Sequence, residues 1–422
     1  MENYTEIKKC RVCNSEHLNE VFKIDKQFLS PTFVKSNDNN PLSKIQIPMT
    51  LLLCDKKINP QGCGLLQLKE SVNPNLLYKN YFYRTAINST MCEDLKNVVL
   101  DVQKHTNLND DDIVMDIGAN DCTMISYFPK NLKRIGVEPA KNINWTKVDD
   151  SIVIVNDYFS KKVVDQSIKD KKVKIITCCA MFYDLDNPNK FVSEIKSILA
   201  PDGIWCIQLS YLSLMIKNIN FYDICNEHLE YYSLNVLKFL MEKNGLTIVD
   251  ASTNSVNGGS IRVFVMHSNK KYESENLKKL YEMEETMDLN NINTYKNFWK
   301  IIEEVKIKVK KYILNDEKTV LGLGASTKGN MLIQLFGITN KMMPYISERN
   351  PEKVGLKTLG TDIELISEDK ARNINPDCML VLPWYFKKEI VEREKEYLKK
   401  GGELVFPMPY PHVVKYGKEE RL

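Results

Sequence analysis

The stretch "CNEHLEYYS", residues 225–233, contains the side chains best suited to moving a proton. His228 follows Glu227, Tyr222 lies six residues before it, and the chain has only five histidines. An imidazole exchanges protons near neutral pH, so His228 is a candidate general base. The spacing alone favours an ordinary polar residue on a solvated helix, so the rest of the chain must decide between the two interpretations.

A turn after a buried strand indicates a cofactor pocket. In "VMDIGANDC", Asp116, Gly118 and Asn120 lie where a strand leads into a helix. A dinucleotide site requires the glycines of G-x-G-x-x-G, which let the backbone approach a pyrophosphate. Here Asn120 and Asp121 take that place, and a carboxylate repels phosphate. The turn therefore favours S-adenosylmethionine (SAM), which has no phosphate and carries an ammonium group.

Acidic residues also end the next two predicted strands. Glu138, followed by Pro139 in "GVEPA", can accept hydrogen bonds from both hydroxyls of a ribose. Asp157 in "VNDYF" lies where an adenine amino group needs an acceptor. Each acid alone is a weak signal, because Asp and Glu often cap helices. Together with Asp116 they predict a SAM site, although Cys122 replaces the glycine that is usual in the turn.

Four cysteines cluster near the N-terminus. Cys10 and Cys13 form "CRVC", and Cys54 and Cys63 bound "CDKKINPQGC". Four thiolates suit tetrahedral Zn²⁺, and a small module rich in loops needs such a crosslink. Reduced core cysteines, or His17 in place of one ligand, are the alternatives. We predict a closed zinc site that stabilises folding.

Alternating strand and helix patterns predict an α/β fold with a parallel, doubly wound sheet of the SAM-dependent methyltransferase (Rossmann-like) type. The expected domains are a zinc-binding module (1–75), a methyltransferase domain with connecting helices (76–310) and a second Rossmann-like unit (311–422). Residues 78–105 and the Lys- and Glu-rich stretch 275–314 are predicted to be helical. The predicted strands are 112–118, 134–140, 151–157, 173–182 and 203–210 in the first unit, and 318–326, 342–350, 378–384 and 402–409 in the second.

Composition limits the classes of function. The 422 residues are 43% hydrophobic and 27% charged, with a net charge of only +3, which gives no electrostatic case for nucleic acid. No stretch has the length of a membrane span, and "MENYTEIKKC" lacks the apolar core of a signal peptide. A cytoplasmic protein that acts on a small molecule, with neither membrane nor nucleic acid as partner, is the expectation.

The chain resembles the sugar-nucleotide C-methyltransferases of deoxysugar biosynthesis. The resemblance covers nearly the whole chain, in motifs such as "CRVC", "DIGANDCTMISYF", "NEHLEYYSL", "NGGSIRVFV" and "LGLGASTKGNMLIQLFGI". It implies three domains, SAM as methyl donor and a nucleotide-linked 4-keto sugar as acceptor. In such a sugar a base removes the C3 proton, and the resulting enolate takes the methyl group.

The resemblance also implies roles for individual residues. His228 matches the last histidine of the family's Tyr-His-Glu-His run, its proposed base, and Glu227 matches the glutamate. Cys225 replaces the tyrosine of that run and Asn226 its first histidine, a position expected to contact substrate. Tyr222 and Tyr231 are the nearby candidates to replace the missing phenol.

Further contacts are expected from three other motifs. Tyr81 and Tyr83 in "YFYRT" resemble the tyrosines that line the family's SAM and sugar pocket. In the glycine-rich "GLGASTKGN", Lys328 is expected near phosphate, as is Arg349. "NGGSIRV" contains Gly259, Ser260 and Arg262. There Arg262 is predicted to bind diphosphate, or else the motif is a tight turn before a strand.

Three other functions stay open at this stage. The altered "CNEH" run keeps O- or N-methyltransfer to a sugar nucleotide or another small metabolite as the main alternative. A zinc-containing RNA methyltransferase or nucleic-acid binder would need a basic stripe, against which the balanced charge argues. A non-catalytic relative would have no reason to keep the acids of the SAM pocket.

Overall fold

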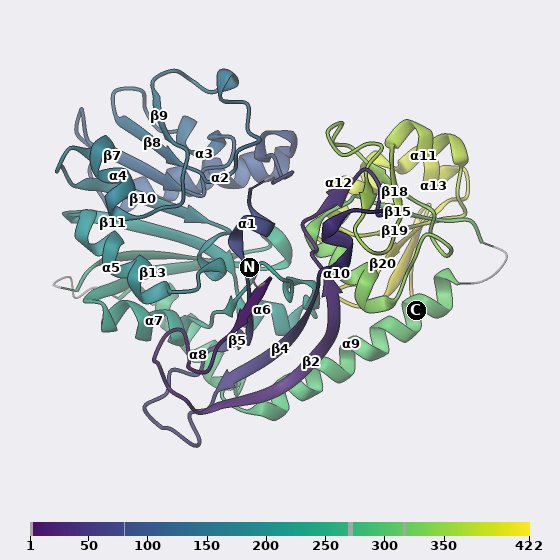
Figure 1. Cartoon of the computed structure of the whole chain (residues 1–422), viewed down its shortest axis with the longest axis horizontal. Helices are drawn as coiled ribbons and strands as arrows, with labels where there is room; N and C mark the ends of the chain where they lie inside the picture. The colour runs from purple at the N-terminus through teal and green to yellow at the C-terminus, as the bar shows by residue number, and fades with distance from the viewer. Residues whose placement is uncertain (1–2, 80, 269–272, 315–317) are drawn as a thin grey trace.

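A computed structural model describes residues 3–79, 81–268, 273–314 and 318–422. Two sheets covered by helices form two lobes that face each other, and a long hairpin from the N-terminal segment runs beneath them (Figure 1). Within the described ranges, no helix combines the length and apolar character needed to cross a membrane.

The first lobe is built on a seven-stranded sheet of order β13-β14-β11-β10-β7-β8-β9. Its strands are β7 (Ile113–Ile117), β8 (Lys133–Val137), β9 (Ile152–Val155), β10 (Val173–Cys179), β11 (Leu199–Ser210), β13 (Leu246–Asn254) and β14 (Ser260–His267). The five strands from β7 to β11 are parallel, as predicted, and β14 runs antiparallel to β11. The order reverses beside β7, and ligands bind at the carboxyl ends of strands at such a point.

The helices of this lobe cover both faces of the sheet. They are α2 (Ser89–Val102), α3 (Thr123–Ser126), α4 (Lys161–Ile168), α5 (Pro188–Ile198), α6 (Leu212–Lys217) and α7 (Leu234–Lys243). The helix predicted over 78–105 is shorter than expected. Asn88 caps it, because its side chain accepts a hydrogen bond from the N–H of Met91, so α2 begins at residue 89. Residues 81–88 form a loop with a short 3₁₀ helix at Thr85–Ile87 instead, and residue 80 lies outside the described ranges.

The second lobe contains a nine-stranded sheet of order β22-β21-β20-β19-β15-β16-β18-β17-β3. Its strands are β3 (Phe33–Val34), β15 (Val320–Leu323), β16 (Tyr345–Glu348), β17 (Lys357–Thr358), β18 (Glu364–Ser367), β19 (Cys378–Val381), β20 (Glu403–Phe406), β21 (His412–Lys415) and β22 (Lys418–Arg421). All four strands predicted for this unit are present, and they pair in parallel with one another or with β18. Its helices are α10 (Thr327–Phe336), α11 (Glu368–Ile374), α12 (Lys387–Arg393) and α13 (Lys395–Lys399).

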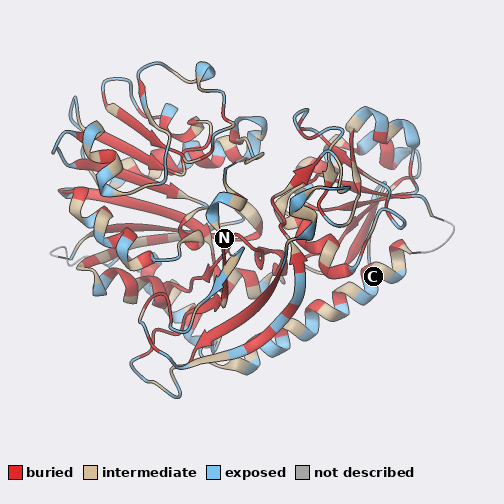
Figure 2. Ribbon diagram, in the orientation of Figure 1, coloured by how far each residue is buried: buried red, intermediate tan, exposed pale blue. Residues whose placement is uncertain are grey.

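The N-terminal segment joins the two lobes. It comprises β1 (Tyr4–Glu6), β2 (Leu18–Phe28), β4 (Gln46–Cys54), β5 (Leu66–Leu68), β6 (Glu70–Val72) and α1 (Pro74–Leu77). The hairpin of β2 and β4 lies along α9 (Ile292–Ile313), which follows α8 (Glu275–Thr286), and the rings of Phe22 and Trp299 stack at 4.7 Å. Buried residues continue from both sheets along this hairpin (Figure 2).

Two strand pairings connect this segment to the lobes. β3 pairs with β17 of the second sheet, and β5 pairs with the short β12 (Glu230–Tyr231) of the first lobe. Because β12 follows residues 225–229 directly, this pairing holds the "CNEHL" loop against the N-terminal sheet.

Candidate active site

A cavity of about 570 Å³ lies between the lobes, at the carboxyl ends of both parallel sheets. Its wall includes eleven residues predicted to bind or react: Tyr81, Tyr83, Asp116, Gly118, Asn120, Glu138, Pro139, Glu227, His228, Lys328 and Arg349. The cavity therefore brings both halves of the predicted site together.

The turn after β7 gives the cavity its cofactor side. Gly118 has φ +77°, and a Cβ there would meet the Cγ atom of Met181 at 3.0 Å, so the close approach requires glycine. Glu138 accepts hydrogen bonds from the N–H groups of Asn120 and Ala140, both at 2.8 Å. Each carboxylate oxygen keeps a lone pair for a further donor, and the two hydroxyls of a ribose are such donors.

Asp116 ends β7 in a fully enclosed position. The Thr177 hydroxyl donates to its Oδ1 at 2.8 Å. Burial raises the pKa of Asp116 to about 8, and the neighbouring Glu138 adds to the rise. A positively charged ligand in the cavity stabilises the carboxylates of Asp116 and Glu138. Their oxygens therefore fit the ammonium group and the ribose hydroxyls of SAM.

Hydrogen bonds hold the loop 81–85 against the turn after β7. Asn120 accepts from the N–H of Thr85 at 3.1 Å and donates to the carbonyl of Tyr83 at 3.1 Å. Tyr81 lines the cavity beside it, while the Tyr83 ring is 40% exposed at the rim. Asn120 therefore positions the two predicted tyrosines.

Asp157 lies elsewhere than predicted. β9 ends at Val155, so Asp157 falls on an exposed turn, where it accepts a hydrogen bond from the N–H of Tyr158 at 2.7 Å. It does not contribute to the cavity wall, whereas Tyr158 and Phe159 do. The position assigned to an adenine acceptor is thus taken by two aromatic rings.

His228 lies in the wall between the lobes, with 7% of its surface exposed. Its ring packs against Tyr183 with the centroids 4.1 Å apart. Burial, together with the positive charge of Lys328, lowers the pKa of His228 to about 3, although the Asp223 backbone has an opposing effect. The imidazole is therefore uncharged at neutral pH, the form that accepts a proton.

Glu227 is buried beside His228. Burial raises the pKa of Glu227 to about 8, while the hydroxyl groups of Thr327 and Tyr81 and the charge of Lys328 oppose the rise. Its Oε1 has no hydrogen-bond partner among the described residues. At neutral pH this carboxyl is mostly protonated and can donate a hydrogen bond.

Two predicted residues of the same region lie outside the cavity wall. Tyr222 is fully buried among Phe221, Trp384 and Tyr385 and is not part of the cavity wall. Asn226 accepts a hydrogen bond from the N–H of Ser30 at 3.4 Å and is not part of the wall either. The proposed replacement of the missing phenol by Tyr222 and the substrate contact of Asn226 do not fit these positions, because packing against other segments holds both side chains.

The second lobe contributes basic groups. Lys328, in the first turn of α10, forms an ion pair with the buried Asp223 and donates to the carbonyl of Asn257 at 3.4 Å. Arg349 pairs with Glu389 at 2.9 Å, and 38% of its side chain is exposed. Both cations line the cavity, where an anionic ligand would meet them.

The "NGGSIRV" motif has a structural role in this geometry. Gly259 and Ser260 lie at the start of β14 against Leu214 and Val256, away from the cavity wall. Arg262 is buried, where it pairs with Asp94 at 3.2 Å and with Asp101. Diphosphate binding by Arg262 does not fit this position, because two carboxylates already neutralise the guanidinium inside the lobe. The tight turn before a strand, the alternative interpretation, describes the motif.

Several residues of the wall had no place in the sequence analysis. They include Tyr78, Asp184, Glu348 and Lys353, of which the last donates to the carbonyl of Ala325 at 2.9 Å. Glu348 could have been predicted from the sequence, because this acidic residue ends the second strand of its unit, as Glu138 does in the first unit. Tyr78 and Asp184 carried none, since neither belongs to a recognisable motif.

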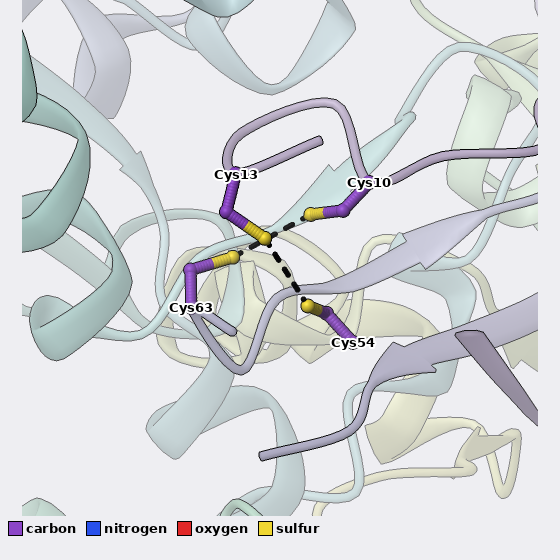
Figure 3. Close-up of side chains that lie close together, drawn as sticks. All are labelled: Cys10, Cys13, Cys54 and Cys63. Carbon is purple, nitrogen blue, oxygen red and sulfur yellow. Dashed lines mark hydrogen bonds between the residues drawn. The ribbon is translucent and has the colours of Figure 1, made fainter. Parts of the chain in front are cut away.

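The four N-terminal cysteines converge on one point (Figure 3). Their Sγ atoms all lie within 4.8 Å of one another, with Cys10 and Cys63 3.5 Å apart and Cys13 and Cys54 3.4 Å apart. Zinc bonds of about 2.3 Å in a tetrahedron separate the sulfurs by about 3.8 Å, so the four thiols fit the ion. His17 is exposed and is not part of the cluster.

Comparisons with known proteins agree with this arrangement. Family models of a zinc-binding domain, a methyltransferase domain and a C-methyltransferase C-terminal domain match residues 10–78, 85–251 and 255–409. The chain is 26% identical to the C-methyltransferase NovU of Streptomyces niveus over 414 residues, or 97% of each chain.

Two solved structures resemble part of the chain. A SAM-dependent methyltransferase of Clostridium acetobutylicum ATCC 824 is 12% identical, with a TM-score of 0.34, over 43% of this chain and 92% of its own. The magnesium protoporphyrin IX methyltransferase of Synechocystis PCC 6803 is 12% identical, with a TM-score of 0.33, over 43% and 88%.

The three family models follow one another in chain order, and the relative from Streptomyces niveus covers nearly the full length. The sheet order and the cluster of four cysteines agree with that division. The chain is therefore a SAM-dependent methyltransferase with an N-terminal zinc-binding domain, and it is similar to a C-methyltransferase along nearly its whole length.

Proposed function

We propose that this enzyme transfers a methyl group to a carbon atom, C3, of a nucleotide-linked 4-keto-deoxysugar, with His228 as the base. The observation that carries the proposal is the place of His228 in the cavity wall. Its uncharged imidazole lies between a lobe whose turn fits SAM and a lobe that presents Lys328 and Arg349. A base in that position reaches a sugar held between a methyl donor and a diphosphate site.

His228 is prepared to accept a proton. An uncharged imidazole has one ring nitrogen with a free lone pair, and that nitrogen can accept a proton. A ketone at C4 acidifies the C–H at C3, so this nitrogen removes the proton and an enolate forms on the sugar. SAM, when bound, supplies the electrophilic methyl group that the C3 carbon takes.

Glu227 stabilises the enolate in this proposal. A protonated carboxyl donates a hydrogen bond to the developing negative charge on the C4 oxygen, a contact that strengthens in the transition state. Such a donor would replace the phenol that the family has where this chain has Cys225. The pKa of about 8 keeps Glu227 protonated over most of the neutral range.

Substrate binding strengthens the base. Lys328 lowers the pKa of His228, and the diphosphate of a sugar nucleotide beside Lys328 offsets that positive charge. The imidazole is then more basic with substrate bound than without it. Lys328 thus links recognition of the nucleotide to proton removal.

The test is hydrogen exchange at the sugar. The protein is incubated in D₂O with 4-keto-6-deoxyhexoses linked to dTDP, GDP or CDP, without SAM, and the H3 signal is followed by NMR. Loss of the signal is expected in the wild type, with a rate at least about 100-fold lower in His228→Asn. His17→Asn, at an exposed histidine, is the matched control and is expected to keep the wild-type rate.

O- or N-methyltransfer is the second candidate, because Cys225 and Asn226 interrupt the family's catalytic run. A hydroxyl or amine acceptor needs no acidic C–H. Methylation of a sugar nucleotide without any exchange at H3 would replace the first proposal by this one.

A further inference from the structure

The second lobe has a glycine turn like the one that fits SAM in the first lobe. β15 ends at Leu323, and Gly324 follows with φ +82°. A Cβ at Gly324 would meet the Cγ atom of Pro383 at 2.8 Å, so the turn requires glycine. Gly324 and Ala325 both line the cavity between the lobes, so a ligand can approach their backbone closely.

Glu348 lies beside this turn, at the end of β16. Its Oε2 accepts a hydrogen bond from the N–H of Ala325 at 3.0 Å, and its Oε1 accepts one from the N–H of Asn350 at 2.7 Å. The residue is only 7% exposed and lines the cavity. The backbone of two segments thus fixes this carboxylate in the cavity wall.

The carboxylate of Glu348 can accept two further hydrogen bonds. Each of its oxygens has two lone pairs, and a backbone N–H uses one of them. Among the described residues, the hydrogen bonds to Glu348 are those from Ala325 and Asn350. The ammonium of Lys353 balances the negative charge from 4.0 Å away and donates instead to the carbonyl of Ala325. Two adjacent hydroxyls of a ribose would supply one donor to each oxygen.

The place of Glu348 in its sheet also indicates a ribose. β16 lies next to β15 and runs parallel to it, and α10 connects the two strands. In α/β folds that bind nucleotides, an acidic residue at the end of the second strand, after a glycine turn and a helix, binds the 2′-hydroxyl of a ribose. Glu348 is therefore placed to contact the one hydroxyl that a deoxyribose lacks.

The charges of the cavity wall decide whose ribose lies there. The second lobe contributes four cations to the wall: Lys328, Arg349, Lys353 and Arg393. The glycine turn of the first lobe is instead surrounded by the acids Asp116 and Glu138. Opposite charges attract, so a diphosphate is drawn to the second lobe and the sulfonium of SAM to the first. The ribose at Glu348 is then that of the sugar nucleotide.

We propose that the sugar substrate is linked to a ribonucleoside diphosphate, whose 2′- and 3′-hydroxyls both donate to Glu348, and that 2′-deoxyribonucleotides such as dTDP bind more weakly. This inference rests on the proposed function, in which a sugar nucleotide fills the second lobe's side of the cavity. It adds the class of nucleotide to that function and makes Glu348 the residue that selects it.

The selection follows from the hydrogen bond that a deoxyribose does not make. With only a 3′-hydroxyl, the bound nucleotide covers one oxygen of Glu348 without giving it a donor. An acceptor buried in this way is costly, and more so when it carries a charge. A site built to bind a hydroxyl therefore rejects the analogue that lacks it.

Isothermal titration calorimetry with three pairs of nucleotides tests the selection: GDP and dGDP, CDP and dCDP, UDP and dUDP. The members of a pair differ only in the 2′-hydroxyl, so the ratio of their Kd values reports the contact with that group. In the wild type the ribonucleotide is expected to bind at least about tenfold more tightly in each pair that binds. In Glu348→Ala the two Kd values should agree within about twofold, because both acceptor oxygens are gone.

A matched variant and an internal ratio guard against a folding defect. Glu364→Gln changes a carboxyl on β18 that is 40% exposed and is not part of the cavity wall, so it should keep the wild-type ratio. Partial unfolding of a variant lowers the fraction of protein that binds, but it does not change the ratio of two Kd values. Titration of each variant with SAM confirms that the first lobe is intact.

The outcomes separate this proposal from the function on which it rests. Kd values that agree within about twofold in every pair that binds to the wild type overturn the selection and leave the proposed function in place. Faster exchange at H3 with the dTDP-linked keto sugar than with the GDP- and CDP-linked ones does the same. A wild-type ratio in Glu348→Ala overturns the role of Glu348. Absence of exchange with all three keto sugars, with SAM binding intact, overturns the proposed function instead.

Discussion

Glu138 and Glu348 hold equivalent positions in the two lobes. Each lies at the carboxyl end of the second strand of its parallel sheet and accepts two backbone hydrogen bonds. For Glu138 the donors are Asn120 and the residue two positions further on, both at 2.8 Å. For Glu348 they are Ala325 at 3.0 Å and again the residue two positions further on, at 2.7 Å. Both carboxylates line the same cavity, so each lobe presents an acceptor suited to a ribose.

The equivalence predicts two separable binding defects. Glu138→Gln is expected to weaken SAM binding about 10- to 100-fold, the value of a hydrogen bond to a charged acceptor, and to leave the affinity for a sugar nucleotide unchanged. Glu348→Gln is expected to do the reverse. Isothermal titration calorimetry with each ligand measures both effects, and each variant is the control for the other. If both variants lose affinity for both SAM and the sugar nucleotide, the carboxylates of Glu138 and Glu348 do not act on separate ligands.

The zinc site predicts a loss of stability when the metal is removed. Elemental analysis should find one zinc per chain, and Cys54→Ser or a strong chelator should lower the melting temperature by at least about 5 °C. The reason is that the segment between Cys10 and Cys13 also carries Arg11, which bonds to β5 and β6. Cys92→Ser, at a cysteine outside the cluster, is the matched control. A zinc-free protein with an unchanged melting temperature would leave the four thiols as reduced core cysteines.

Two neighbouring residues predict opposite dependences of stability on pH. The pKa of Glu227 rises from 4.5 to about 8 on folding, so between these values the folded chain binds more protons than the unfolded chain. The free energy of unfolding therefore falls as the pH rises through this window. The pKa of His228 falls from 6.5 to about 3, so its contribution to stability is lost as the pH falls from 6.5 toward 3.

Urea denaturation at a series of pH values measures these contributions without ligand. Above pH 6.5 the His228 contribution is constant, so Glu227→Gln should reduce the loss of stability between pH 6.5 and 8 by up to about 1.4 kcal/mol per pH unit. His228→Asn should remove the loss below pH 6.5 by the same argument. Parallel stability curves for Glu227→Gln and wild type would contradict a protonated Glu227 in the folded state.

Local sequence patterns were sufficient for the strands and for the location of several residues in the cavity wall. The nine predicted strands are present because apolar runs between turn residues report burial in a parallel sheet directly. Asp116, Gly118 and Glu138 were placed correctly at the edge of a sheet, since a strand end fixes where its last side chain lies. The prediction for Asp157 was wrong because β9 ends two residues before it, and the sequence "VIVND" does not reveal where that strand ends.

Contacts between distant segments were not accessible to such patterns. Nothing in the residues around Glu230 indicates that β12 adds to a sheet formed by the N-terminal segment, although this pairing holds the loop of residues 225–229. Tyr222 was considered for the site because it precedes His228 by six positions, but its ring packs into the interior. Arg262 was predicted to bind diphosphate from its place in "NGGSIRV", and the local sequence does not reveal its partner Asp94, which lies 168 residues away in the chain.

The position of Arg262 gives a prediction that separates packing from substrate binding. Arg262→Met leaves Asp94 buried and without its cation, and breaking a buried ion pair costs about 3 to 5 kcal/mol of the free energy of unfolding. The affinity for a sugar nucleotide is expected to stay within about twofold of wild type, because the guanidinium is not part of the cavity wall. Arg349→Met is the matched variant: its side chain is 38% exposed, so stability should change little, while affinity should fall about tenfold. Denaturation and calorimetry on the two proteins measure all four quantities. A weaker ligand complex in Arg262→Met, at a temperature where that variant is fully folded, would return Arg262 to the diphosphate site and require β14 to move when substrate binds.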